Sequence, residues 1–235
     1  MKNIVQFSGG KDSTAMLIGL LERDIGIDEA VFFDTGWEFD SVYRNIEFWQ
    51  TKLENMGVPF TVLKPKLSFD YQAFEKLVQH RDGTTSNGYA WCGGVCRWGT
   101  TEKVRELEKY CNGHNELVGF AVDEQQRIVK DRKGIKQYPL NDWGVTERQA
   151  LQMCYDNKVE YIEDGVDLQQ IRLYDILDRG SCFCCGNKNL KELKGMYQSL
   201  PKYWERLKEM QSKTDRLYKK VGLQALEHRF EKELL

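Results

Sequence analysis

The chain has 235 residues, of which 41% are hydrophobic, and a formal net charge of −2. This length supports one well-buried α/β core with a small appended module and disfavours a second full domain. The first seven residues lack the apolar core of a signal peptide, and no apolar stretch approaches the roughly 18 residues that a membrane span needs. We therefore expect a cytoplasmic protein without membrane contact.

Strand and helix patterns alternate from the N-terminus onward. Short apolar runs bounded by Gly or Pro predict strands, and apolar residues three or four apart predict the helices between them. The expected strands are 3–7, 29–34, 59–63 and 116–122, and the expected helices are 12–23, 41–56 and 101–110. This alternation predicts an α/β fold with a doubly wound, mainly parallel sheet that binds ligands at the carboxyl ends of its strands.

The rest of the chain is predicted from polar stretches and helix signals. A polar, glycine-rich stretch over 80–99 is expected to be a long loop. Thr146 is a candidate helix cap, and Pro201 is suited to start a helix in the C-terminal part. We expect an α/β domain over 1–180 and a cysteine-containing helical extension over 181–235. Residues 186–235 carry 12 Lys or Arg against 7 Asp or Glu, which favours a solvated basic face, with a nucleic-acid contact as the alternative.

A phosphate-binding loop is predicted between the first strand and the first helix, where the chain reads Ser8-Gly9-Gly10-Lys11-Asp12-Ser13-Thr14. The two glycines let backbone N–H groups converge on a phosphate, and the helix dipole favours its negative charge. Lys11 adds a cation, and the hydroxyl side chains add donors. The spacing differs from the Walker pattern, which has four residues between its Gly and its Gly-Lys pair.

This string resembles the signature of the PP-loop ATP pyrophosphatases and, within them, of the phosphoadenosine phosphosulfate (PAPS) reductase-like family, whose fold is adenine nucleotide alpha hydrolase-like. The resemblance extends to Asp34-Thr35-Gly36, to residues 119–124 with Arg127, and to 138–140 with Trp143. It covers about residues 1–212. The position that is usually Arg in the third element is Ala121 here.

The resemblance implies roles for residues in three segments. The loop from Ser8 to Thr14 is expected to hold the phosphates of ATP or PAPS with Mg²⁺, and Asp34, Thr35 and Gly36 to lie near the ribose or adenine. The expected catalytic residues are Lys11, Asp12, Glu124 and Arg127. A simple turn at Asp34 and a surface ion pair between Glu124 and Arg127 are the structural alternatives.

Five of the seven cysteines fall in two groups, Cys92 with Cys96 and Cys182 with Cys184 and Cys185. Four thiolates in two pairs can bind Zn²⁺ or a 4Fe–4S cluster. We therefore predict Cys92, Cys96, Cys182 and Cys185 as metal ligands. A redox dithiol formed by Cys182 and Cys185, or a set of inert buried thiols, remain alternatives.

The favoured function is an ATP-dependent, AMP-forming enzyme that activates a substrate oxygen for sulfur or nitrogen transfer, with a modified base in tRNA or DNA as the leading substrate. A sulfonucleotide reductase or hydrolase and a non-catalytic, metal-stabilised nucleotide-binding module are the alternatives. Reductases of this group carry a further nucleophilic Cys near the C-terminus, and the chain has no Cys after Cys185, which favours the first hypothesis. The expected partner is an adenine nucleotide, with tRNA or DNA, a sulfur donor protein and a second copy of the chain as further candidates.

Overall fold

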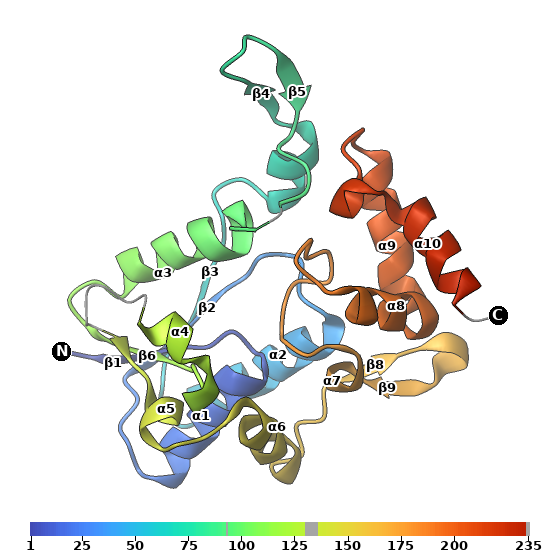
Figure 1. Ribbon diagram of the computed structural model, residues 1–235. Helices are drawn as coiled ribbons and strands as arrows, with labels where there is room; N and C mark the ends of the chain where they lie inside the picture. Colours follow the sequence, from blue (N-terminus) through green and yellow to red (C-terminus); the bar gives the residue numbers. More distant parts are fainter. Residues whose placement is uncertain (93, 130–135, 234–235) are drawn as a thin grey trace. The chain divides into compact units, whose positions relative to one another are not determined.

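The computed structural model describes residues 1–92, 94–129 and 136–233 (Figure 1). Its contacts divide it into two compact units. Unit 1 comprises Met1–Asp34, Asp40–Leu63 and Val104–Tyr161, and unit 2 comprises Thr35–Phe39, Lys64–Lys103 and Ile162–Leu235. Each unit is a set of residues that contact one another in space, so it combines three separate stretches of the chain. The expected division along the sequence at residue 180 stays a prediction.

Unit 1 contains a five-stranded, fully parallel sheet in the order β3-β2-β1-β6-β7. At its centre, Val5 lies opposite Ala30 and Leu117, and all three side chains are buried. The sheet confirms the predicted α/β fold. Its strands are β1 (Asn3–Gln6), β2 (Glu29–Phe33), β3 (Phe60–Leu63), β6 (Asn115–Val118) and β7 (Lys136–Gln137).

Helices cover both faces of this sheet, as right-handed crossovers require. On one face lie α1 (Lys11–Glu22) and α2 (Asp40–Asn55), and on the other lies α3 (Lys103–Tyr110) (Figure 1). Both α5 (Pro139–Asp142) and α6 (Glu147–Asp156) pack against α1. Thr146 caps α6 as predicted, because its hydroxyl accepts a hydrogen bond from the amide of Gln149. This capping fixes where α6 begins, and therefore where Glu147 lies.

The strand order reverses between β1 and β6, and such a switch point is where open α/β sheets bind ligands. The predicted strand 116–122 ends earlier than expected, at Val118, because the amide of Phe120 turns back to the carbonyl of Val118. A 3₁₀ turn, η3 (Val122–Glu124), and a short helix, α4 (Gln125–Ile128), follow. A Cβ on Gly119 would lie 2.9 Å from the carbonyl oxygen of Asp12, so the chain leaving β6 passes directly against the start of α1.

Unit 2 contains two antiparallel hairpins, β4 (Leu77–Gln79) with β5 (Thr85–Asn87) and β8 (Ile162–Asp164) with β9 (Gln170–Arg172). The first lies partly within the stretch 80–99, where a loop was expected. The carbonyl of Thr84 accepts a hydrogen bond from the amide of His80, which closes the hairpin turn. Two π-helical turns, η1 (Tyr71–Glu75) and η2 (Arg97–Glu102), flank this hairpin. The sequence did not predict these elements, because the segment is polar and lacks the apolar pattern of a strand or helix.

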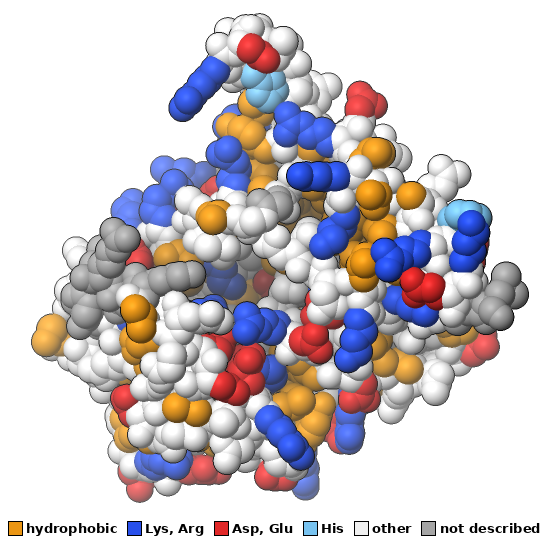
Figure 2. Space-filling model, viewed as in Figure 1, with side chains coloured by type: hydrophobic (Ala, Val, Ile, Leu, Met, Phe, Trp, Pro, Cys, Tyr) orange, Lys and Arg blue, Asp and Glu red, His pale blue; other side chains and the backbone are white. Residues whose placement is uncertain are grey.

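The part of unit 2 after the second cysteine group is helical, as predicted, and contains α8 (Leu190–Ser199), α9 (Pro201–Ser212), η5 (Tyr218–Lys220) and α10 (Leu223–Lys232). A further short helix, α7 (Leu173–Ile176), precedes that group. Pro201 occupies the first turn of α9. The basic side chains over these helices are interspersed with acidic ones (Figure 2), and Glu233 pairs with both Lys194 and Arg229. Among the described residues, no helix combines the length and the apolar character needed to cross a membrane.

Candidate active site

The predicted phosphate loop joins β1 to α1 at the switch point of the sheet. Gly9 has φ +75°, and a Cβ there would lie 2.6 Å from Cγ1 of Ile46, so both its conformation and its surroundings call for glycine. The first helical hydrogen bond of α1 runs from the amide of Thr14 to the carbonyl of Gly10. The amides before Thr14 therefore lie at the positive end of the helix, where an anion binds favourably.

Three buried side chains hold this loop in place. The Asn45 amide group donates to the carbonyl of Gly9 at 2.8 Å and to the Thr14 hydroxyl at 2.9 Å. The Tyr161 hydroxyl lies 2.9 Å from Thr14 Oγ1 and 3.2 Å from the Asn45 nitrogen. Asn45, Thr14 and Tyr161 are therefore all hydrogen-bonded to one another, and this network holds the loop in its conformation before any ligand binds.

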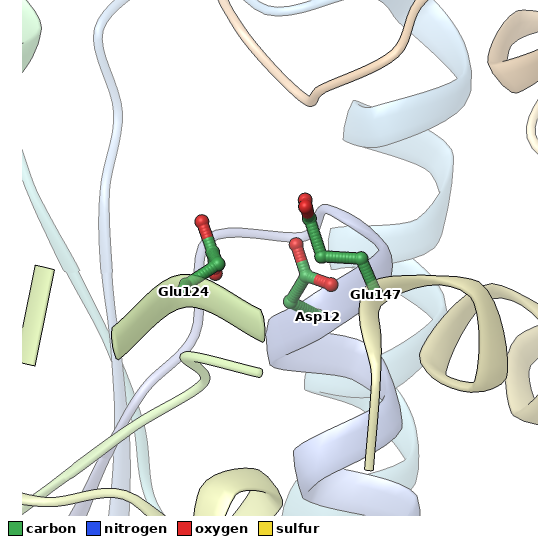
Figure 3. Close-up of side chains that lie close together, drawn as sticks. All are labelled: Asp12, Glu124 and Glu147. Atoms are coloured by element: carbon green, nitrogen blue, oxygen red, sulfur yellow. The ribbon is translucent and has the colours of Figure 1, made fainter. Parts of the chain in front are cut away.

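Three carboxylates converge beside the start of α1 (Figure 3). Asp12 projects from α1, Glu124 from η3 and Glu147 from α6, and one oxygen from each lies within 4.8 Å of the others. The Lys11 ammonium lies 2.9 Å from an oxygen of Asp12 and 3.0 Å from one of Glu147. Lys11 thus pairs with two of the three carboxyl groups.

The charges of this cluster determine its protonation. Burial raises the pKa of Asp12 to about 6, although Lys11 opposes the shift, and the Glu124 and Glu147 carboxylates add to it. Burial alone would lower the pKa of Lys11, but Asp12 and Glu147 outweigh it, so this pKa lies above its usual value. Lys11 therefore stays charged.

Glu124 and Arg127 form an ion pair at 2.6 Å, as the structural alternative expected, but Glu124 itself is 1% exposed. The Arg127 guanidinium also lies 3.9 Å from the ring centroid of Phe120, which stacks on Tyr138. Glu124 is therefore a buried carboxylate of the cluster, and its partner Arg127 is half-exposed and lies over the ring of Phe120.

The predicted nucleotide residues after β2 fall in both units. Asp34, in unit 1, accepts a 2.8 Å hydrogen bond from the Tyr43 hydroxyl. Thr35 and Gly36 belong to unit 2, where the buried Thr35 hydroxyl lies 3.2 Å from Glu38 Oε1 and caps the amide of Trp37. Their roles in nucleotide binding stay predictions.

Both cysteine groups lie in unit 2, in loops that touch each other. The Asn187 side chain accepts a hydrogen bond from the amide of Gly94 at 3.0 Å and donates one to its carbonyl at 2.8 Å. A Cβ on Gly186 would lie 2.5 Å from the carbonyl oxygen of Cys92. The fold thus brings together two cysteine loops that are about ninety residues apart in the chain.

The pKa values of Cys92 and Cys96 shift in opposite directions. The Cys92 thiol donates to the Cys96 sulfur, which raises the pKa of Cys92, and the amides of Gly99, Trp98 and Thr100 add hydrogen bonds, so that the pKa of Cys96 falls to about 6. Burial, with the Glu38 carboxylate nearby, instead raises the pKa of Cys182.

The sulfur atoms are not gathered as tightly as a zinc site requires. Zn–S bonds of about 2.3 Å place tetrahedral sulfurs about 3.8 Å apart, and no three cysteine sulfurs of the described ranges lie within 4.8 Å of one another. The set of four cysteine ligands stays a prediction.

Sequence reasoning missed three residues of the unit 1 site: Glu147, Asn45 and Tyr161. Glu147 directly follows the Thr146 cap, and an acidic residue in the first turn of a helix is ordinarily explained by the helix dipole. Asn45 and Tyr161 belong to no recognisable motif, since they act on the loop from 31 and 147 residues away from Thr14.

Comparison with known proteins gives a family match and a distant relative. The family model of the phosphoadenosine phosphosulfate reductase domain matches residues 2–163. An uncharacterized protein of Methanocaldococcus jannaschii is 28% identical over 214 residues, which cover 86% of this chain. The chain spans only about 40% of the length of that relative.

Proposed function

Because the chain belongs to the phosphoadenosine phosphosulfate reductase domain family, we propose that it is an adenine-nucleotide enzyme whose phosphate loop binds ATP. The amides at the start of α1 would face the phosphates. The hydrogen bonds of Asn45 and Tyr161 already order the loop, so less conformational entropy of the loop is lost on binding. Asp34, at the end of β2, would lie toward the ribose.

The cluster of Asp12, Glu124 and Glu147 is the observation that favours ATP. Carboxylate oxygens are the donors that Mg²⁺ prefers, and the group places three of them within 4.8 Å. When bound, Mg²⁺ would neutralise charge on the pyrophosphate of ATP. A sulfonucleotide has no pyrophosphate to release, so this cluster is more useful to an enzyme that cleaves ATP.

In the proposed reaction, a substrate oxygen attacks the α-phosphorus, the bond to the bridging oxygen breaks, and pyrophosphate leaves with its electron pair. The adenylated substrate is then attacked by a sulfur or nitrogen nucleophile, which displaces AMP. Lys11, which the carboxylates keep protonated, would stabilise negative charge near the phosphates. A base in tRNA or DNA is our candidate acceptor.

Nucleotide titrations test this proposal. We expect Mg²⁺-ATP to bind the wild type, and Glu147→Gln to weaken that binding at least tenfold, because it removes one metal-binding charge while keeping the side-chain shape. Lys109→Met, which changes an exposed lysine of α3, serves as the matched control. Release of pyrophosphate and AMP with tRNA or DNA would identify the acceptor. Binding without turnover, with all acceptors tried, would favour the non-catalytic module.

A sulfonucleotide substrate is the second candidate, and the family match favours it. Such an enzyme would reduce or hydrolyse PAPS or adenylyl sulfate and would have no need of the carboxylate cluster. Binding of PAPS that is unaffected by Mg²⁺ and by Glu147→Gln, with no binding of ATP, would establish this alternative.

We also propose that Cys92, Cys96, Cys182 and Cys185 hold Zn²⁺ or a 4Fe–4S cluster. Soft thiolate donors suit both groups, and the contact between the two cysteine loops supports a shared site. The hydrogen bonds from backbone amides to the Cys96 sulfur are of the kind that stabilises a ligating thiolate. The bound group would tie the two loops together. Iron, sulfide and zinc analysis after anaerobic purification tests the site.

A further inference from the structure

A basic surface lies beside the β4–β5 hairpin of unit 2. It consists of three cations, Lys76, Arg97 and Arg216, which all lie close to one aromatic residue. The Arg97 guanidinium is 3.9 Å from the ring centroid of Tyr89, and the Lys76 ammonium is 5.9 Å from it. Arg216 donates a 3.3 Å hydrogen bond to the carbonyl of Tyr89. The region around this hairpin is rich in Lys and Arg side chains (Figure 2).

The protein does not neutralise these three cations. Within 1–92, 94–129 and 136–233, none of them forms an ion pair with a carboxylate at 4.0 Å or less. Both arginine side chains are exposed. The Arg97 guanidinium packs on the ring and donates no hydrogen bond to the described residues, so its five N–H donors remain available to a ligand. Such a surface attracts a polyanion.

The backbone holds the ring at the centre of this surface in one position. The amide of Gly88 donates to the carbonyl of Lys76 at 2.7 Å. The next amide, that of Tyr89, donates to the carbonyl of Gln72 in η1 at 3.1 Å. A Cβ on Gly88 would lie 1.9 Å from the carbonyl oxygen of Ala73, so the chain leaving β5 passes directly against η1. The surface is therefore ordered before a partner binds.

The chemistry of this surface favours an unpaired nucleic-acid strand among polyanions. A guanidinium with one face on a tyrosine ring can stack its other face on a base, while its edge donates to a phosphate. The bases of a duplex are already stacked on one another and offer no such face. A lipid surface suits the hairpin less well, because its turn over 81–85 carries polar and charged side chains, whereas segments that enter a bilayer interface carry apolar ones.

We propose that Lys76, Arg97 and Arg216 bind the phosphates of a single-stranded segment of nucleic acid. Tyr89 is a positioning residue, because it holds the Arg97 guanidinium in the plane from which it stacks on an unpaired base. This inference deepens the proposed function and rests on its nucleic-acid acceptor, for which it names the binding surface. RNA and DNA strands share the chemistry that is recognised, so both are tested.

Fluorescence anisotropy with labelled, mixed-sequence strands of about 15 nucleotides, at several salt concentrations, tests the proposal. With single strands, each phosphate contact contributes about 0.7 to the slope of log affinity against log salt concentration. Lys76→Gln with Arg216→Gln should therefore reduce this slope by about 1.4 and weaken binding roughly tenfold or more. Lys191→Gln with Lys232→Gln removes the same charge from α8 and α10 and should change neither quantity.

Arg97→Lys tests the stacking role separately, because lysine keeps the charge and lacks the planar group. We expect this variant to keep the salt slope of the wild type and to lose the preference for a single strand over a duplex of the same sequence. Tyr89→Leu should lose the same preference, since the guanidinium then has no ring to hold it. Melting temperatures verify that each variant is folded.

Several outcomes would contradict the proposal. Equal weakening in the double variant and its control would mean that binding depends on net charge alone. Binding to polyglutamate or to phosphatidylserine vesicles as tightly as to the strands would assign the surface to another partner, and an unchanged strand preference in Arg97→Lys would exclude stacking. A wild type that binds Mg²⁺-ATP but neither strand would overturn this surface and the nucleic-acid acceptor while leaving the nucleotide site intact. Strand binding that depends on these residues, in a protein that binds no nucleotide, would support the surface and overturn the proposed function.

Discussion

Asp12 has a pKa of about 6 in the folded protein, whereas its unfolded value is near 3.8, and burial is the main cause. Between these two values the native state binds more protons than the unfolded state. The stability that this group contributes is therefore fully present below pH 3.8 and is lost as the pH rises toward 6. A difference of about two pKa units corresponds to about 3 kcal/mol.

This shift predicts the pH profile of Asp12→Asn. In magnesium-free buffer, the free energy of unfolding of the wild type minus that of the variant should fall by up to about 3 kcal/mol between pH 4 and pH 7. Urea denaturation at a series of pH values measures this difference. Asp24→Asn, which changes an exposed carboxyl of unit 1, controls for net charge. A difference that stays flat over this range would contradict the electrostatic account of Asp12.

Asn45→Ala tests how the loop is held in place. The variant leaves the buried carbonyl of Gly9 without the 2.8 Å hydrogen bond from the side-chain amide. An unsatisfied buried acceptor costs about 1–3 kcal/mol, so we expect a loss of stability in this range, together with weaker binding of ATP. Tyr161→Phe removes one hydroxyl of the same group and should have a smaller effect. Nucleotide affinity equal to that of the wild type would show that the loop does not depend on this support.

At the scale of elements, the end of β6 and the start of α1 approach each other through Gly119. In Gly119→Ala, the new Cβ would lie 2.9 Å from backbone atoms of Asp12 and Ser13, which cannot move without shifting the phosphate loop. We expect a destabilisation of about 1–3 kcal/mol and a clear loss of affinity for Mg²⁺-ATP. Gly26→Ala is the matched control, because nothing lies within 4 Å of its Cβ. Equal affinities in the two variants would contradict the proposed role of this contact.

The elements of the sheet were predictable because their signals are local. The run Asn3–Gln6 followed by two glycines and the start of α1 carries strand, turn and helix information within a few residues, and the structure confirms each. The end of β6 was not predictable, since the turn at Gly119 depends on contact with α1, over a hundred residues earlier. Glu147 and Asn45 were missed for the same reason: their importance arises from residues that approach them only in the folded chain.

At the scale of the whole molecule, the two proposed sites lie in different units. The carboxylate cluster and the phosphate loop are built from residues of unit 1, and the five grouped cysteines belong to unit 2. A group bound by the cysteines would stabilise mainly the segments that provide them, because a ligand stabilises the state to which it binds.

Hydrogen exchange with and without the bound metal tests this division. We expect metal removal to raise amide exchange in Lys64–Lys103 and Ile162–Leu235, which carry the cysteine loops, and to leave exchange in β1 and α1 nearly unchanged. Affinity for ATP should then differ less than threefold between the two forms. The variant with Cys182→Ser and Cys185→Ser should reproduce the metal-free pattern, and Cys111→Ser, a buried cysteine of unit 1, should not. Faster exchange in α1 after metal removal would mean that the cysteine site also supports the nucleotide site.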